Sequence, residues 1–410
     1  MESVIAKIRL MAEQCECGQA HVEIPIEKIV VANGALGQVG AYLEEKSLKK
    51  AAILADQHTY KAAGEALVKQ LEQTQIEATV IRIQPDENGD VVADEKALVQ
   101  ALLNISDDTD VLLSVGAGTI HDITRFCGAK MKIPFISIPT APSVDGFTSL
   151  GAPLIVNGVK KTFQMMAPIA VFADLAILTR APRKMIAAGF GDMVAKITSL
   201  ADWRFGHLIA GEPYCPLVAQ MTKEALESCV SHYHQIAKGE ETGIQLLIEA
   251  LIESGLAMLL FGQSHPASGG EHHLSHYWEM EFIKKKQKAV LHGAKVGVST
   301  ALLSEIYKDD FLKMIEDEKE LERLNHGVHK DIIENLKEHR GEIQQLFRNI
   351  PDSDQIRQWV ETIGGESLPE QLGISQELLN RSLVEAHNLR DRLTALKFLN
   401  EVAEYPLVRV

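Results

Sequence analysis

Three residues in the second half of the chain have side chains of the kinds that bind divalent metal ions. Asp192 closes a Gly-Phe-Gly-Asp run, His272 lies in a Gly-Glu-His-His run, and His292 is followed by glycine. One carboxylate and two neutral imidazoles form a metal site that keeps positions open for a substrate. A single histidine on a helix is more often an ordinary core or surface residue, so the prediction depends on the fold bringing the three together.

The segment around His272 has the pattern of a helix start. Ser268 followed by Glu271 three residues later fits a capping box, which predicts a helix beginning at this point. His272 and His276 are then four residues apart on one helix face, while His273 points elsewhere and is interpreted as a bystander.

A glycine turn in the first half is typical of phosphate binding. Gly116 and Gly118 lie between an apolar run and a helix start, where backbone N–H groups can point at a pyrophosphate. The third glycine of the dinucleotide fingerprint is missing, so a tight turn without a ligand is an equal alternative. Asp56 ends an earlier strand, where a carboxylate binds ribose hydroxyls or caps the next helix; taken alone, the cap is favoured.

The cysteines do not form a disulfide framework, because there are only five in 410 residues: Cys15, Cys17, Cys127, Cys215 and Cys229. A reducing compartment is the simpler interpretation. Cys15 and Cys17 with His21 offer three metal ligands and no second cysteine pair, so we interpret them as incidental.

The elements that must position these residues change type near Pro182. Before it, short apolar runs alternate with helical stretches, which predicts an α/β unit with a parallel, doubly wound sheet that binds ligands at the carboxyl ends of its strands. Strands are expected at 50–56, 77–83, 110–115, 133–138 and 171–178, helices at 60–73 and 94–104, and a β-hairpin around the Asn-Gly of 154–160.

The second half is predicted to be all-helical, from its long segments of 3.6-residue period. Helices are expected at 185–205, 216–237, 244–261, 270–286, 289–305, 307–350 and 375–404, with a break at 364–369. We therefore expect two domains, residues 1–183 and 184–410.

Composition and charge narrow the class of protein. Apolar residues are 46% and charged residues 24%, as in ordinary globular proteins, and the net charge of -15 opposes binding to nucleic acid or anionic membranes. An anionic substrate must then be met by local cations, a metal or helix N-termini. Residues 1–19 have no signal pattern and the longest apolar run is short, so a cytoplasmic protein is expected.

Five motifs in order resemble the sn-glycerol-1-phosphate dehydrogenases: 116–122, 138–149, 189–192, 265–272 and 292–293. The resemblance covers about Ile26 to Thr300, and 390–394 is similar as well. The superfamily also contains metal-dependent glycerol dehydrogenases and dehydroquinate synthases, which implies a Rossmann-like NAD(P)-binding domain followed by an all-helical domain. The sequence is most similar to the Bacillus-type branch, which implies nickel first and zinc, the metal of the archaeal branch, second.

The resemblance also implies a role for each matching residue. The metal ligands are Asp192, His272 and His292, and the substrate and catalytic residues are Asp145, Asp192 and His276. In the cofactor site, the adenosine ribose is held by Asp56, the pyrophosphate by Gly116, Ala117, Gly118, Thr119 and Ile120, and the nicotinamide by Thr140, Ala141, Pro142, Ser143 and Ser149.

The implied reaction is the reversible, NAD(P)H-dependent reduction of dihydroxyacetone phosphate to sn-glycerol 1-phosphate, a glycerophospholipid precursor, by a homodimer. His276 suits proton transfer because a histidine pKa lies near neutrality, and the charge of Asp56 favours NAD over NADP. Archaeal members often carry arginine where this chain has His265, which leaves phosphate binding to cations such as Lys160, Lys161 or Lys196. The alternatives are a polyol dehydrogenase, a dehydroquinate synthase-like lyase and a non-catalytic nucleotide-binding regulator.

Overall fold

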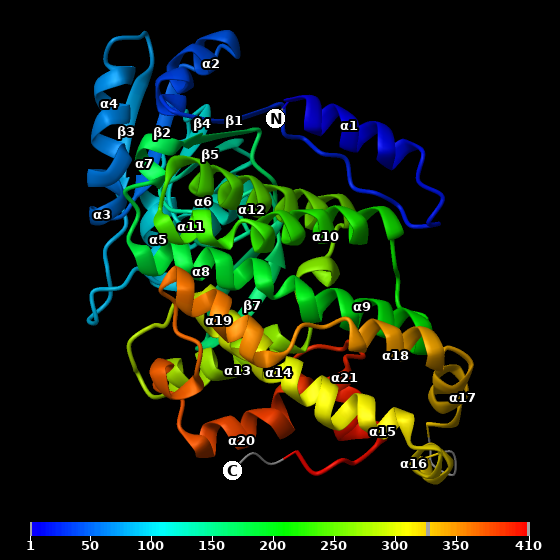
Figure 1. Ribbon diagram of the computed structural model, residues 1–410. Helices are drawn as coiled ribbons and strands as arrows, with labels where there is room; N and C mark the ends of the chain where they lie inside the picture. The colour runs from blue at the N-terminus through cyan, green and yellow to red at the C-terminus, as the bar shows by residue number, and fades with distance from the viewer. Residues whose placement is uncertain (1, 325–328, 408–410) are drawn as a thin grey trace.

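The computed structural model describes residues 2–324 and 329–407. The first half contains a six-stranded, fully parallel sheet in the order β1-β8-β5-β4-β2-β3 (Figure 1). Every residue of β4, β5 and β8 is buried, as expected of a parallel sheet covered on both faces. The predicted sheet is confirmed, and its strands are β1 (Lys28–Ala32), β2 (Lys50–Ala55), β3 (Glu77–Arg82), β4 (Val111–Gly116), β5 (Phe135–Pro139) and β8 (Ala170–Asp174).

Helices cover the two faces of this sheet, and neighbouring strand residues divide between them. Ile53 and Leu113 pack in one buried cluster with α2 and α4, whereas Leu54 and Leu112 pack in another with α5 and α6. The helices are α2 (Val39–Glu45), α3 (Gln57–Thr59) with a π-turn at Tyr60–Gly64, α4 (Glu65–Leu71), α5 (Glu95–Asn104) and α6 (Gly118–Met131).

The predicted hairpin is present as β6 (Gly151–Val156) and β7 (Val159–Gln164). Asn157 and Gly158 both have positive φ, 52° and 73°, as a type I′ turn requires. The strand expected at 171–178 is only partly right, because α7 (Leu175–Leu178) begins directly after β8. Asp174 ends the strand there, since its carboxylate accepts the N–H of Ala176 at 3.0 Å and caps α7.

The second half is helical, as predicted, but the expected helix 307–350 is divided at Asp317 and His339, and three other expected helices are also interrupted. The expected helix 185–205 is interrupted at Ala195, the helix 216–237 at His232, and the helix 375–404 at 390–394, where Thr394 caps a new helix. Residues 325–328 of the expected helix 307–350 lie outside the described residues. The helices are α8 (Arg183–Val194), α9 (Lys196–Ala210), α10 (Pro216–Ser231), α11 (Tyr233–Lys238), α12 (Glu241–Phe261), α13 (Gly270–Lys284), α14 (His292–Ile306), α15 (Lys313–Glu316), α16 (Glu318–Leu324), α17 (Lys330–Glu338), α18 (Arg340–Arg348), α19 (Ser353–Ile363), α20 (Gln376–Glu385) and α21 (Ala395–Lys397).

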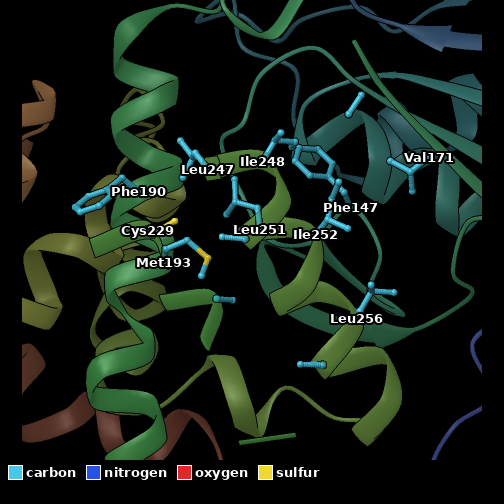
Figure 2. Packing of buried hydrophobic residues seen from close by; sticks show 14 of the residues in the cluster. Phe147, Val171, Phe190, Met193, Cys229, Leu247, Ile248, Leu251, Ile252 and Leu256 are labelled. Carbon is cyan, nitrogen blue, oxygen red and sulfur yellow. The ribbon is translucent and has the colours of Figure 1, made fainter. Parts of the chain in front are cut away.

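Helix α12 joins the two halves. Figure 2 shows Leu247 and Leu251 of α12 between Phe190 of α8 on one side and Phe147 and Val171 on the other. Among the described helices only α12 is long and apolar enough to cross a membrane, and 72% of its apolar window is buried inside the fold, as in a core helix. This buried cluster draws on both sides of the division between 1–183 and 184–410, which stays a prediction.

The chain begins with a helix that the sequence patterns did not predict. Helix α1 (Glu2–Glu13) buries Ile5 and Ile8 against the same cluster. Arg9 donates to the carbonyl groups of Ile24 and Ile26, at 2.7 and 3.1 Å. These contacts hold the irregular segment 14–27, between α1 and β1, against the fold.

Candidate metal and dinucleotide site

The three predicted metal ligands come together from three helices. Nε2 of His272 lies 3.9 Å and Nε2 of His292 3.8 Å from Oδ1 of Asp192, and all three ligand atoms lie within 4.8 Å of one another. That Oδ1 is buried and accepts no hydrogen bond from the described residues. A divalent ion with bonds of about 2.1 Å fits between such atoms with small adjustments.

Glycines allow the helices that carry these ligands to touch. A Cβ on Gly191 would lie 2.2 Å from the carbonyl oxygen of Gly293, and one on Gly293 would lie 1.8 Å from that of Ala188. Helices α8 and α14 are therefore in backbone contact, which brings His292 next to Asp192. Gly191 belongs to the sequence motif 189–192, and Gly293 belongs to the motif 292–293.

Glu271 orients His272, and this role was missed in the sequence. Its Oε1 lies 2.8 Å from Nδ1 of His272, and when Nδ1–H donates to it, Nε2 keeps its lone pair for a metal. Burial raises the pKa of Glu271, although hydrogen bonds from Gly269 and Thr198 lower it. The predicted capping box is wrong, because Gly269 is the N-cap of α13 and Ser268 lies before it.

Asp145 is linked directly to the metal ligands. Its backbone N–H donates to Oδ2 of Asp192 at 2.9 Å, and its side chain accepts from Ser254 at 2.9 Å. The ammonium group of Lys196 lies 2.7 Å from Asp145 and 3.5 Å from Asp192. Burial lowers the pKa of Lys196, but these two carboxylates outweigh it and raise the pKa, so the residue is a cation.

His276 lies beside both of the histidines predicted to bind the metal. Its ring centroid is 6.1 Å from that of His272 and 5.8 Å from that of His292. Burial lowers the pKa of His276 well below its usual value, and the cations Lys160 and Arg390 lower it further. The expected pKa near neutrality is therefore wrong for this environment, and His276 is neutral at pH 7.

The residues predicted to bind the dinucleotide lie together at the carboxyl ends of the sheet strands. The register pairs Leu54 with Ser114 and Gly116 with Pro139, so that Asp56, Gly116 and Thr140 lie at the carboxyl ends of three adjacent strands. Parallel sheets bind nucleotides at this edge. The sequence argument correctly places these positions together.

The glycine turn connects β4 to α6 as predicted. A Cβ on Gly116 would lie 2.7 Å from Ile120, and one on Gly118 would lie 3.2 Å from Val144, so both positions are closely packed. Asp56 caps α3, since its Oδ1 accepts the N–H groups of His58 and Thr59 at 2.7 and 2.8 Å. The alternative favoured for Asp56 alone is thus confirmed, and its contact with a ribose stays a prediction.

The loop 140–150 carries the residues expected to line the nicotinamide. Thr140, Ser143 and Ser149 are all buried. The buried guanidinium of Arg125 holds the end of this loop by donating to the carbonyl groups of Gly146 and Gly151. A Cβ on Gly189 would lie 1.8 Å from the carbonyl oxygen of Pro142, so the loop also lies directly against α8.

Comparison with known proteins agrees with this arrangement. Residues 30–182 match the family described as iron-containing alcohol dehydrogenase. A glycerol-1-phosphate dehydrogenase [NAD(P)+] of Geobacillus stearothermophilus is 54% identical over 403 residues, covering 98% of this chain and 99% of that protein. This chain belongs to the glycerol-1-phosphate dehydrogenase family. The member from Bacillus subtilis is 42% identical, covering 94% of this chain and 93% of that protein.

The solved structures of more distant proteins share the fold. Glycerol dehydrogenase from Schizosaccharomyces pombe superposes with a TM-score of 0.63 at 18% identity, covering 92% of this chain and 90% of that chain. Maleylacetate reductase from Agrobacterium tumefaciens gives a TM-score of 0.66 at 14% identity, covering 95% and 99%. The predicted fold class and the predicted family of oxidoreductases are both confirmed.

Two arginines near the site of this family member were not given a role in the sequence. Arg390 donates to the hydroxyl groups of Ser264 and Ser268 at 3.2 and 3.1 Å, and Arg392 donates to the carbonyl group of Ser268. Neither guanidinium forms an ion pair with a carboxylate among the described residues. Burial lowers the pKa of both groups, that of Arg392 to about 10. The feature of the sequence that could have pointed to these two arginines is the similarity of residues 390–394 to the family.

The other cations considered for the phosphate have carboxylate partners, with one exception. Lys160 of β7 lies 2.8 and 2.9 Å from the two oxygens of Glu279 on α13, and Lys295 of α14 lies 2.9 Å from the same group. Lys196 is held by two carboxylates, as described above. Lys161 has no ion pair among the described residues and lies on the exposed hairpin.

Proposed function

We propose that this chain catalyses the reversible, NAD(P)-dependent reduction of dihydroxyacetone phosphate to sn-glycerol 1-phosphate. The observation that carries the proposal is the convergence of Asp192, His272 and His292 beside a parallel-sheet edge with a glycine turn. Two buried arginines without anionic partners add a means of binding a phosphate. The names of the full-length relatives support the same reaction.

The metal site favours a carbonyl substrate. Asp192, His272 and His292 would hold one divalent ion, nickel by preference and zinc next, and such an ion polarises a carbonyl oxygen. The ammonium group of Lys196 lies 2.7 Å from Asp145 and 3.5 Å from Asp192, and Glu271 keeps Nε2 of His272 turned toward Asp192. The three metal ligands, Lys196 and Glu271 hold this arrangement without a bound substrate.

Neutral His276 is proposed to contact the substrate and move a proton. A neutral imidazole carries one N–H and one acceptor nitrogen, so it can donate a hydrogen bond to a substrate oxygen. Its ring makes no hydrogen bond to the described residues, and its centroid lies 6.1 and 5.8 Å from those of His272 and His292. Asp145, whose carboxylate is held by Ser254 and Lys196, would bind a substrate hydroxyl.

The cofactor would lie along the carboxyl ends of β2, β4 and β5. The N-terminus of α6, after Gly116, would hold the pyrophosphate, and the loop 140–150 would line the nicotinamide, which supplies the hydride. Asp56 keeps Oδ2 available for a ribose hydroxyl while Oδ1 caps α3. NAD is therefore the preferred cofactor, with NADP tolerated.

Arg390 and Arg392 are proposed to bind the substrate phosphate. Both lie close enough to His265 to lower its pKa, after burial, to about 3. They thus supply positive charge near the position where archaeal relatives often carry an arginine. Guanidinium groups suit this task because they donate two hydrogen bonds to one phosphate.

The test of the reaction is NADH consumption with dihydroxyacetone phosphate by the purified protein, before and after chelation and metal addition. Metal-dependent turnover that yields sn-glycerol 1-phosphate is expected. NADH formation from glycerol with no turnover of the phosphate would move the chain to the polyol dehydrogenases. Elemental analysis of the same sample identifies the metal.

The test of the phosphate site uses a substrate without the phosphate as its control. Arg390→Ala should raise KM for dihydroxyacetone phosphate by about 10- to 100-fold, because a hydrogen bond to a charged group contributes about 1.5–3 kcal/mol. Its effect on dihydroxyacetone should stay within about twofold. Equal losses with both substrates would refute a role in phosphate binding.

The assembly and location of the protein are further proposals. We expect a homodimer, which light scattering on the purified protein tests directly. A cytoplasmic location is expected because the site acts on small soluble molecules, and cell fractionation tests it. Neither nucleic acid nor a membrane is a proposed partner, given the acidic net charge.

A further inference from the structure

A second group of metal-ligating side chains lies outside the site described above. Cys15, Cys17 and His21 come from the irregular segment 14–27, and Cys215 is the N-cap of α10. The ligand atoms of all four lie within 4.8 Å of one another. The sequence interpretation of the first three as incidental depended on the lack of a fourth ligand. The fold supplies that ligand 194 positions after His21.

The distances between these atoms agree with tetrahedral coordination. The sulfurs of Cys15 and Cys215 are 3.7 Å apart, and Nε2 of His21 lies 3.5 Å from the sulfur of Cys17 and 3.9 Å from that of Cys215. Tetrahedral zinc with normal bond lengths keeps two sulfurs about 3.8 Å apart and a sulfur and a nitrogen about 3.6 Å apart. All five cysteines are free thiols, so no disulfide accounts for this cluster.

We propose that Cys15, Cys17, His21 and Cys215 form a structural zinc site. Four protein ligands close a tetrahedral zinc site and leave no position for a substrate, which is the property of structural sites. Thiolates are soft ligands, and a set of three thiolates favours zinc. The Asp192, His272 and His292 set, by contrast, also accepts harder ions. The cluster shares no residue with the Asp192 site, so the two sites differ in chemistry and are independent.

The position of the cluster indicates what the zinc does. Segment 14–27 has no regular secondary structure and reaches α12 through the hydrogen bond from Val22 N–H to the carbonyl of Leu260 at 2.9 Å. Cys215 is fully buried in the core that contains Trp203, while Cys15 and Cys17 pack on its edge. Zinc would therefore fasten the N-terminal segment to the connection between α9 and α10, closing a loop of about 200 residues, and such cross-links stabilise a fold.

The first experiment measures zinc in full-length protein purified without chelators. His272→Ala is used as the background, because it removes a ligand of the other site and leaves about one zinc per chain in the cysteine cluster. A mercurial reagent that binds thiols should release this zinc to a colorimetric indicator. Cys17→Ser and Cys215→Ser should lose it, whereas the matched control Cys127→Ser, a buried cysteine on α6, should keep it.

Three outcomes would overturn the proposal. One is equal zinc content in His272→Ala with and without Cys17→Ser, and another is a disulfide between Cys15 and Cys215 in peptides mapped without reduction. The third needs no variant of the cluster: Co²⁺-loaded protein that lacks thiolate-to-cobalt absorption, since the Asp192 site has no sulfur ligand. Cys17→Ser in the otherwise native chain should keep turnover of dihydroxyacetone phosphate within about twofold when the Asp192 site is loaded, which separates this test from that of the reaction.

Discussion

Replacing Glu271 tests whether a buried carboxylate controls metal binding by His272. Oε1 of Glu271 lies 2.8 Å from Nδ1 of His272 and 2.6 Å from the backbone nitrogen of Gly269. Oε2 accepts from the hydroxyl of Thr198 at 2.7 Å, and the residue is 0% exposed. Glu271→Gln keeps the shape and one acceptor oxygen but removes the charge, whereas Glu271→Ala removes the acceptor altogether.

The size of the effect follows from the hydrogen bond that each variant keeps. Loss of a residue that orients a metal ligand weakens metal binding by about 10- to 100-fold. A hydrogen bond to a carboxylate is roughly twice as strong as a neutral one, so Glu271→Gln should lie near the lower limit. Glu271→Ala leaves Nδ1 of His272 unpaired and should lie near the upper limit, about 2.7 kcal/mol of binding free energy.

The assay is competition for the metal against a chromophoric chelator, with Asp202→Asn as the matched control. Asp202 of α9 is also a buried carboxylate that contacts the start of α13, and it accepts from Gly270 N–H and from the hydroxyl of Tyr307, both at 2.8 Å. It makes no hydrogen bond to His272, so Asp202→Asn should change the metal Kd by less than about twofold. Wild-type affinity in Glu271→Ala, or equal weakening in Asp202→Asn, would refute the reasoning.

Three further changes test other parts of the structure. Asp56→Asn keeps a side chain that caps helices but loses the charge, so the ratio of kcat/KM for NADP to that for NAD should rise about tenfold. Burial raises the pKa of Asp202 from 3.8 to about 7. The contribution of this group to the unfolding free energy is therefore fully present below about pH 4 and is lost as the pH rises through 7. The unfolding free energy of the wild type, measured against Asp202→Asn, should therefore fall by up to about 4 kcal/mol over that window. In urea denaturation, Gly293→Ala should cost about 3 kcal/mol, because its Cβ meets the carbonyl of Ala188 at 1.8 Å, whereas Gly341→Ala, with nothing within 4 Å, should gain up to about 1 kcal/mol.

Each of these changes has a result that would contradict its reasoning. An unchanged cofactor ratio in Asp56→Asn would mean that the carboxylate acts only as the cap of α3. A pH-independent difference between the wild type and Asp202→Asn would mean that Asp202 titrates alike in the folded and unfolded chains. Equal stability of Gly293→Ala and Gly341→Ala would mean that α8 and α14 can separate at no cost.

The sheet could be predicted because local patterns determine it, and the candidate metal ligands because their residue types and motifs are visible in the sequence. Largely apolar runs such as 111–115 are buried on both faces, and a parallel sheet is the structure that buries them. The glycines next to Asp192 and His292 are visible in the sequence, although their purpose, backbone contact between α8 and α14, is visible only in the fold.

The remaining parts of the site depend on contacts that no local pattern contains. Cys215 joins Cys15 only because α10 begins beside the N-terminal segment. The sequence predicts a continuous helix from 375 to 404 that includes Arg390, because a charged residue fits the outer face of a helix as well as a loop. The helix is interrupted where Thr394 caps a new turn, and that interruption turns the arginine toward Ser264.

The distribution of buried charge explains how an acidic chain could bind an anionic substrate. With a net charge of -15, the field of the whole protein repels a phosphate ester. Near the metal ligands, Lys196 is used by Asp192 and Asp145, and the cations around Glu279 are used by that carboxylate. Arg390 and Arg392 alone among these cations have hydroxyl and carbonyl partners but no carboxylate among the described residues. Burial lowers the pKa of both guanidinium groups, and the nearby carboxylates Glu271 and Glu212 offset this only in part, so a bound phosphate would add a favourable partner. Selectivity for a phosphorylated substrate over a plain polyol can thus arise from this pair, independently of the metal and the cofactor.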